Sequence, residues 1–276
     1  MLKKTAIAAG LGLILSSAAQ AEYQFEVGAN SGTGDVDLGP VSADQDFIGL
    51  SGAYYLQSVD TSKGPLSEAA FLDRASSIQL AASMGEIDAD NAGDADVDTY
   101  AAGTRLVHKE SGWLVDLGYR FDEIDPDNLE KEEIDTYSIG AGKYVLENTA
   151  VVLSYSNIDS DLEGDSDAYD LGVEHLWMFD TGALKLDANI GRIDLDDSDD
   201  VDVWGLGGTY YVNDRLGFGT AYEQEDSDNT DLESWSLFAE WFVTENVALA
   251  LAYTEQEDQD IDLETDAFMF RADVRF

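Results

Sequence analysis

Apolar and polar residues alternate along most of the chain after Glu22, and helical periodicity is almost absent. The clearest examples are the segment 113–121 and the last ten residues, in which every second residue is apolar. A period of two places successive side chains on opposite faces of a strand. Each segment has about ten residues, the length of a tilted strand that crosses a bilayer. The pattern therefore predicts membrane-crossing β-strands.

Read in this way, the chain contains about fourteen strands, with 12 to 16 possible. We expect them near residues 22–31, 46–57, 70–84, 98–107, 112–121, 134–145, 149–157, 168–178, 183–193, 202–211, 216–222, 233–242, 247–254 and 267–276. One register conflict remains open. Arg74 shares the face of Ile78 and Leu80, so either a bulge resets the register there or the segment Pro65–Glu68 stays outside the membrane.

The connections between these strands alternate in character. Five are short and rich in Gly, Asn and Asp, which favour tight hairpins: 108–112, 146–149, 179–182, 212–215 and 243–246. Seven are long and acidic: 31–46, 85–98, 122–133, 158–168, 194–202, 223–233 and 255–266. The long set holds 41 of the 58 acids in 85 residues and a single base, Lys131. Charge is therefore segregated to one end of the predicted strands.

This alternation predicts an all-β fold, a transmembrane antiparallel up-and-down β-barrel with short periplasmic turns and long acidic extracellular loops. Solvated loops of a soluble sandwich would explain the acid but not the regular alternation of short and long connections. Aromatic residues support the barrel, because they sit at both ends of the strands on the apolar face, as two headgroup girdles would.

Residues 1–21 read as a cleavable signal peptide. Lys3 and Lys4 precede an apolar run, and Ala19-Gln20-Ala21 is a small-x-small cleavage site. The apolar run is too short for a transmembrane anchor. We therefore expect a barrel formed by residues 22–276 and located in the bacterial outer membrane.

The amino-acid composition excludes several classes of function. The 14 bases and 58 acids give a net charge of −44, and loss of 1–21, with two lysines and no acid, would leave 12 bases and a charge of −46. Such a chain has no surface for nucleic acid. With no cysteine, disulfides and thiol chemistry are excluded. A hydrophobic content of 44% argues against disorder.

The residues on the face opposite the apolar one are expected to line the lumen, and the many glycines among them leave open space inside the barrel. Its ionisable members have two readings that we weigh equally: charge pairs that hold the barrel round, or a selectivity lining with a transverse field. The candidate pore-lining residues are Asp73, Arg105, Asp116, Arg120, Glu174, Lys185, Asp187, Glu240, Arg271 and Asp273.

No motif indicates an enzyme, a cofactor or a dedicated metal site. The runs Asp88–Asp98 and Asp258–Asp262 lack the glycine and terminal glutamate of a calcium loop, so only loose divalent-cation binding is expected. His108 and His175 lie near short turns rather than at the extracellular rim, and no G-x-S-x-G occurs.

The chain resembles the Gram-negative outer-membrane porins, most closely the general bacterial porins of gammaproteobacteria. The likeness rests on residues 1–21, on the segment Gly64–Asp73 and on the alternating end of the chain. It implies that Phe268, Phe270, Val274 and Phe276 form the signal read by the barrel-assembly machinery. It also implies contacts with lipopolysaccharide and periplasmic chaperones, and a possible homo-oligomer.

Three functions follow. The leading one is a passive, cation-preferring diffusion channel for small hydrophilic solutes, because inward glycines in about fourteen strands should leave a lumen. The alternative is a structural or adhesive barrel with a closed lumen and functional acidic loops. A transporter of hydrophobic substrates is disfavoured, since no N-terminal plug is expected before the strand at Glu22.

Overall fold

The computed structural model describes residues 22–38, 41–89, 93–127, 129–162, 164–195, 200–227, 231–258 and 263–276, so the expected signal peptide lies outside the described residues. Fourteen strands run through these ranges: β1 (Glu22–Leu38), β2 (Val41–Asp60), β3 (Ser77–Ala89), β4 (Gly93–His108), β5 (Trp113–Pro126), β6 (Glu132–Leu146), β7 (Thr149–Ser160), β8 (Gly164–Phe179), β9 (Gly182–Leu195), β10 (Val201–Asn213), β11 (Leu216–Asp226), β12 (Asp231–Thr244), β13 (Val247–Asp258) and β14 (Leu263–Arg275).

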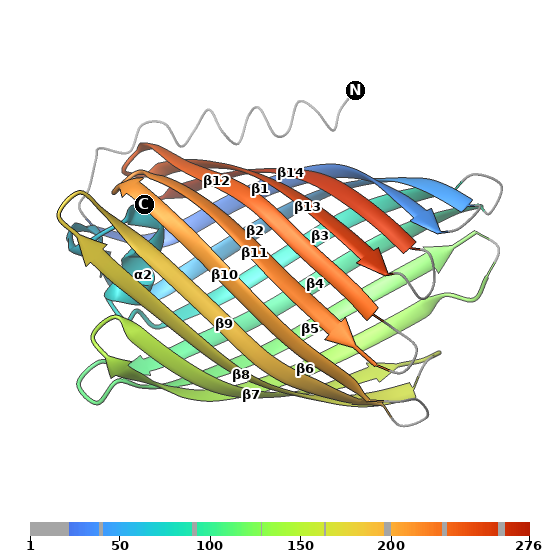
Figure 1. Ribbon diagram of the computed structural model, residues 1–276, viewed down its shortest axis with the longest axis horizontal. Helices are drawn as coiled ribbons and strands as arrows, with labels where there is room; N and C mark the ends of the chain where they lie inside the picture. The colour runs from blue at the N-terminus through green and yellow to red at the C-terminus, as the bar shows by residue number, and fades with distance from the viewer. Residues whose placement is uncertain are drawn as a thin grey trace.

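The strands form one closed antiparallel barrel (Figure 1). Each strand pairs with its neighbours in sequence, and β1 also pairs with β14, for example at Ala29 and Ala272. A closed sheet leaves no strand edge unpaired, which a hydrocarbon environment requires. The prediction of an all-β barrel with about fourteen strands is confirmed.

The outer face is apolar in its middle. Leu50, Leu80 and Leu153 point outward with 61%, 62% and 60% of their surface exposed. Leucines exposed in this number would be unfavourable in water but are stable against lipid tails. Above them, towards the acidic end, aromatic rings meet across neighbouring strands in the pairs Tyr119–Tyr137, Tyr155–Tyr169, Trp204–Tyr222 and Tyr253–Phe268, with centroids 4.8 to 5.4 Å apart. This aromatic belt marks the level of the headgroups.

The predicted bounds of six of the seven acidic loops are wrong, because the strands continue into them. β1 continues to Leu38 and β2 begins at Val41, so most of the expected loop 31–46 is strand. The same holds at five of the other six sites, where strand residues make up most of the expected loop. The exception is 194–202, where β9 ends at Leu195 and β10 begins at Val201, within two residues of the predicted bounds. A high density of acids is typical of loops, yet acids and small or apolar residues still alternate in these segments and the backbone ladder continues. The barrel therefore extends well beyond the aromatic belt.

On β2 and β4 the acids of this extension point outward, because exposed acidic positions alternate with half-buried ones. Carboxylates lie directly opposite one another across strands, as Asp46, Glu86 and Asp96 do. Opposed like charges destabilise a sheet, so they are tolerated only in water. One consequence is that Asp165 raises the pKa of Asp159 above its ordinary value.

The opposite end of the barrel departs from the expected strand 70–84. The chain between β2 and β3 instead forms two 3-10 turns, η1 (Thr61–Lys63) and η2 (Leu66–Glu68), and the one-turn helix α2 (Ala69–Leu72). Arg74 has a φ of 51°, which is incompatible with a strand. Pro65–Glu68 therefore belongs to no strand, and its position outside the membrane stays a prediction. No helix in the described ranges has the length and apolar character of a membrane span.

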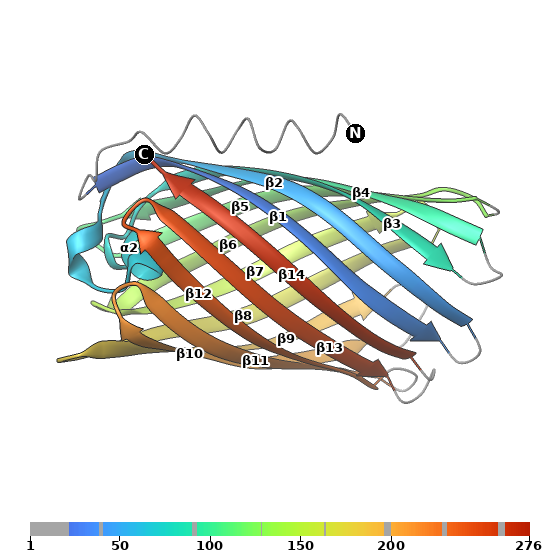
Figure 2. The ribbon, with the colours of Figure 1, turned by 90° about the horizontal axis from the view of Figure 1, so that it is seen from above.

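Figures 1 and 2 show α2, the start of β1 and the end of β14 at the same end of the barrel. The acidic extensions lie at the far end. With a periplasmic start for β1, this arrangement places α2 at the periplasmic end and the acids outside the cell.

The orientation can be tested with single cysteines, because the chain has none of its own. Leu162, in the β7–β8 turn at the acidic end, is 53% exposed. We expect a membrane-impermeant maleimide to label L162C in intact cells. The matched variant E147C, in the β6–β7 turn at the opposite end, should react only after permeabilisation. Labelling of E147C alone in intact cells would invert the topology.

Candidate functional site

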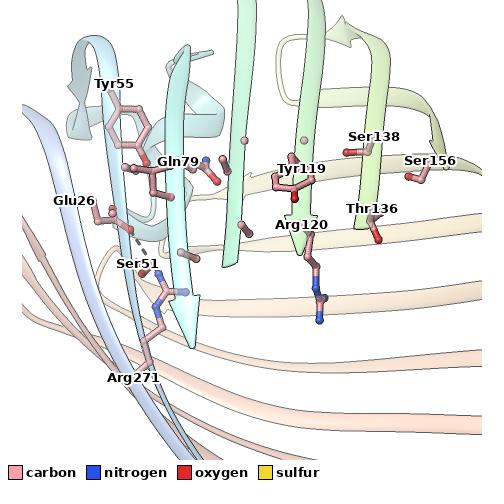
Figure 3. Close-up of a pocket in the computed structure, with 18 residues that line it drawn as sticks. Glu26, Ser51, Tyr55, Gln79, Tyr119, Arg120, Thr136, Ser138, Ser156 and Arg271 are labelled. Carbon is pink, nitrogen blue, oxygen red and sulfur yellow. Dashed lines mark ion pairs between the residues drawn. The ribbon is translucent and has the colours of Figure 1, made fainter. Parts of the chain in front are cut away.

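The middle of the barrel encloses a cavity of about 600 Å³ (Figure 3). Its wall is formed by β1–β7 and β14, and most of its inward residues are small or carry a hydroxyl. Arg120 and Arg271 reach into it from β5 and β14, and Glu26 lies on β1. The lumen thus offers polar space at the level where the outer face is apolar.

A second cavity of about 440 Å³ continues from the first towards the periplasmic end, and the two share Tyr55, Gln79 and Gly103. Its lining adds two ion pairs. Arg105 donates two hydrogen bonds of 2.8 Å to Asp116, and the Lys185 ammonium lies 3.0 Å from Glu174. Charge in this part of the lumen is therefore paired.

The periplasmic end of the lumen is filled by residues 61–76, which we call the plug segment. Its Phe71 packs in a buried cluster with residues of β5 to β10, including Leu114, Tyr144 and Tyr211. Other plug residues complete two further buried clusters: Ala69 and Ala75 with residues of β1 and β2, and Leu66 with residues of β12 and β13. The segment therefore contacts the barrel wall on opposite sides.

The local sequence explains this fold. Asp60 caps η1 by accepting hydrogen bonds from the backbone and hydroxyl of Ser62, which lower its pKa. The run that follows is rich in alanine and leucine, which favour helix. Arg74 ends the helix in a left-handed conformation, and its backbone N–H donates to the carbonyl of Phe71. The apolar side chains then face the barrel wall rather than water.

Two acids of the plug segment are bound by the wall. Glu68 is buried and accepts a 2.5 Å hydrogen bond from Tyr211, with Lys185 3.4 Å away. Asp73 is also buried and lies 2.9 Å from Lys109 and 2.5 Å from Lys63. Buried carboxylates are stable only when paired in this way. The plug is therefore held by charge as well as by apolar packing.

Arg275 on β14 makes the deepest of these contacts, with only 7% of its side chain exposed. It donates 2.7 Å to the carbonyl of Leu66 and 2.6 Å to Glu26. Its guanidinium also lies over the rings of Tyr23 and Phe242, 4.7 and 4.6 Å from their centroids. One residue thus joins the plug segment to β1, β12 and β14.

Nine of the ten predicted pore-lining residues lie on strands at inward positions; the exception is Asp73, which belongs to the plug segment rather than to a strand. Those that the structure brings together are Arg105 with Asp116, Glu174 with Lys185, and Arg271 with Asp273. Asp187 lies opposite Glu174. Arg120 pairs instead with Asp122, nearer the extracellular end, and Glu240 contacts Ser67 of the plug segment. That these residues line an open pore stays a prediction.

Sequence reasoning missed Glu68, Tyr211 and Glu26 as parts of this site. Glu68 contacts residues more than a hundred positions away, so no local pattern indicates its role. The clue available was the helix-forming run after Pro65, which interrupts the alternation of the flanking strands.

Beyond the aromatic belt the inner wall becomes largely aliphatic. Val97 on β4 faces Ile124 on β5, and Ile193 on β9 faces Val201 on β10, all at half-buried inward positions. The inward acids here include Glu223 and Glu225 on β11. Burial, and then the charge of Glu223, raises the pKa of Glu225. The extracellular mouth of the barrel thus carries acids on its outer and its inner face, and the inner acids are separated by aliphatic residues.

The acidic runs do not assemble a metal site within the described ranges, where no group of three potential ligands is found. Asp90, Asp260 and Asp262 lie outside those ranges. His108 contacts the hydroxyl of Ser111, and His175 contacts that of Thr149 at 2.6 Å.

The proposed assembly residues lie at the seam that closes the barrel. Phe276 exchanges backbone hydrogen bonds of 2.8 and 2.9 Å with Phe25, and the two rings stack with centroids 5.6 Å apart. Phe268 and Phe270 point outward, 52% and 48% exposed, while Val274 is buried beside the seam. Recognition of these residues by assembly factors stays a prediction, but their position gives them a second role in closure.

Two family models match the chain. Residues 2–129 match the family described as "Putative general bacterial porin", and residues 175–261 match the Gram-negative porins. None of the curated proteins compared with the chain matches it.

Among solved structures, the outer membrane protein Omp33 of Acinetobacter baumannii is similar, with a TM-score of 0.66 and 22% identity over 94% of this chain and 100% of that one. OccK7 (OpdD) of Pseudomonas aeruginosa has a TM-score of 0.47 and 10% identity, covering 92% of this chain and 99% of that one. The β domain of the Bordetella autotransporter BrkA has a TM-score of 0.48 and 10% identity, over 92% and 98%. The Omp33 likeness supports the outer-membrane barrel fold.

The seam generates a prediction about Phe276. Deleting it removes a stacked ring and the backbone hydrogen bonds of Phe276 to Gln24 and Phe25 at the end of the β1–β14 ladder, and it alters the proposed assembly signal. We expect severalfold less heat-modifiable, folded barrel in cell membranes, measured by gel shift. F25A removes the stacking partner but keeps Phe276, so we expect lower thermal stability, by about 1 kcal/mol, with normal yield.

W241A, which removes an outward aromatic residue on β12 away from the seam, serves as the control. If F25A lowers the yield as strongly as the deletion does, closure rather than recognition explains the effect. Normal yield after the deletion would remove the assembly role altogether.

Proposed function

We propose that this chain, an outer-membrane β-barrel of the Gram-negative porin type, is a diffusion channel for small hydrophilic solutes that is closed at its periplasmic end by the plug segment. The observation that carries the proposal is the pair of connected polar cavities that occupies the lumen above the plug. Porin family models match both halves of the chain and support the channel class.

The plug segment also favours a second candidate, a structural or adhesive barrel whose lumen stays closed. Its buried clusters and ion pairs engage opposite sides of the wall, so opening must break them together. The two candidates differ in whether the plug leaves the lumen. A channel requires that it can.

We also propose a preference for cations. The inward bases Arg105, Arg120, Lys185, Arg271 and Arg275 are all bound by acids, whereas Glu223 and Glu225 have no inward base beside them in the register of β10 to β12. Outward acids of the extension add a negative potential over the mouth. Both effects concentrate cations at the entrance.

The proposed channel also requires a route to the outer membrane. The signal peptide at 1–21 would deliver the chain for secretion, and periplasmic chaperones and the barrel-assembly machinery would insert it. Lipopolysaccharide would surround the outward acids of the extension, and a homo-oligomer is possible.

Removal of the plug tests the channel. Leu56 already bonds to Ser76 across the plug's base, so replacing residues 57–75 with Asn-Gly should close a short hairpin there. We expect single-channel conductance in planar bilayers to rise at least severalfold over the intact protein. F71A, which removes one ring from the plug's buried cluster, should give an intermediate increase or more frequent openings.

Equal conductance of the intact and plug-less proteins would mean that the plug does not close the lumen. Silence of both, with normal heat-modifiable folding, would support the closed structural barrel instead.

Reversal potentials across a KCl gradient test the cation preference. We expect cation preference at 0.1 M salt that declines towards 1 M, as the Debye length falls from ~10 Å to ~3 Å. The inward variant E223Q/E225Q should lower it more than D226N, an outward neighbour on the same strand. Anion preference at 0.1 M would mean that the lumen arginines dominate.

Acidification gives a second readout of the same groups. The raised pKa of Glu225 means that it takes up its proton at a higher pH than an ordinary glutamate. The preference should therefore begin to fall earlier in an acid titration of the intact protein than in E225Q, which has already lost that charge. Identical titrations would exclude a role for Glu225.

A further inference from the structure

The cavity of about 600 Å³ in the middle of the barrel has an unusual floor, formed by two adjacent rows of inward residues. One row runs Gln79, Gly103, Gly118, Ser138, Ser156 across β3 to β7, and the other runs Ser51, Ala81, Ala101, Arg120, Thr136 across β2 to β6. Gly103 and Gly118 in the first row and Ala81 and Ala101 in the second carry only hydrogen atoms or methyl groups. Arg120 stands beside Gly118 on β5, and its guanidinium binds Asp122 further along the strand. The floor is therefore flat over Gly103 and Gly118, with Gln79 at one end of the first row, Ser138 and Ser156 at the other end, and Arg120 along one side.

The dimensions limit what can lie on this floor. Gln79 and Ser138 are three strand spacings apart, roughly 14 Å between backbones. Once their side chains are counted, a single six-membered ring fits between them. A flat ring over glycine can approach the backbone closely, because no Cβ intervenes.

The side chains at the two ends of the floor indicate which substituents a bound ring should carry. The side chains at both ends, visible in Figure 3, are hydroxyls and an amide, groups that donate and accept hydrogen bonds alike. The charges beside them are already engaged. Arg120 donates two hydrogen bonds to Asp122, and Arg271 is bound by Asp273 and Glu26. A neutral solute with hydroxyls around its edge matches these groups, while an ion would have to displace an existing pair.

We infer that this floor, the glycine platform, is a binding site for neutral polyhydroxylated ring solutes, that is, simple sugars. This inference rests on the proposed function, because sugar binding in the lumen is a step of transport only if the barrel is a channel. The ring lies over Gly103 and Gly118, and its edge hydroxyls hydrogen-bond with Gln79 at one end and with Ser138 and Ser156 at the other. Such a site raises the occupancy of the lumen by sugars over other solutes of equal size.

Saturation-transfer NMR on the barrel in lipid nanodiscs measures this binding directly and does not require an open channel. The probes are D-glucose and glycine betaine, a small solute without hydroxyls. We expect saturation transfer to glucose and little to betaine. S138A/S156A should weaken glucose binding about tenfold, as loss of one or two hydrogen bonds would.

Occlusion of the floor gives the sharper variant. A Cβ at Gly103 would meet only the Leu117 carbonyl at 3.6 Å, so G103L adds bulk to the floor without forcing the backbone. It should abolish the glucose signal. G172L is the matched control, because Gly172 lies on β8 outside this cavity and its Cβ would also have a single contact, 3.7 Å from Asp170. Heat modifiability confirms folding, and G103A is the milder substitute if G103L fails to fold.

Potassium conductance of the same preparations separates the two proposals. Glucose binding lost in G103L and kept in G172L, in a barrel that never conducts even without its plug, would support the platform and overturn the channel. A conducting barrel that binds glucose and betaine equally, or that binds glucose equally well in G103L, would overturn the platform and leave the channel intact.

Discussion

Closure of the sheet between β1 and β14 is the constraint on which every other feature depends. In hydrocarbon, a backbone N–H or carbonyl without a partner costs several kcal/mol, so the strands must pair until no edge remains. The pairing of Ala29 with Ala272 and the bonds from Phe25 to Phe276 complete that circle. Once the ring is closed, the period of two assigns each side chain either to lipid or to the lumen.

The residues that face outward are apolar beside the lipid but acidic beyond the aromatic belt, and the residues that face inward change in the opposite sense. Beside the lipid, leucines and aromatic rings point out and serines and glycines point in. Beyond the aromatic belt, acids point out and valines and isoleucines point in, as Asp96 and Val97 do on neighbouring positions of β4. The reason is the outer medium, since apolar groups are favourable against lipid and charges are favourable against water. The barrel wall is continuous, and only its surroundings change.

The periplasmic end of the barrel differs from the rest, because buried ion pairs hold the plug segment there. Arg275, Glu26, Glu68 and Lys185 lie where water is largely excluded, and each is stable only through its partners. Loss of one partner leaves another charge unpaired, so the plug, the wall and the seam are energetically coupled. The space left above them is polar and neutral overall, and this combination favours hydrophilic solutes in the lumen.

The alternation of apolar and polar residues was enough to predict the crossing strands and their two faces, because a period of two is a local property that each segment carries. The sequence by itself misplaced the strand ends, since acids at 31–46 or 85–98 are compatible with a loop or with a strand in water, and only the ladder across neighbouring strands decides between them. It could not give the plug. Glu68 meets Tyr211 across 143 positions, and Leu66 meets Arg275 across 209, so their contact exists only after the barrel has closed. The tertiary structure decided these features because burial and charge pairing depend on which distant residues the closed ring brings together.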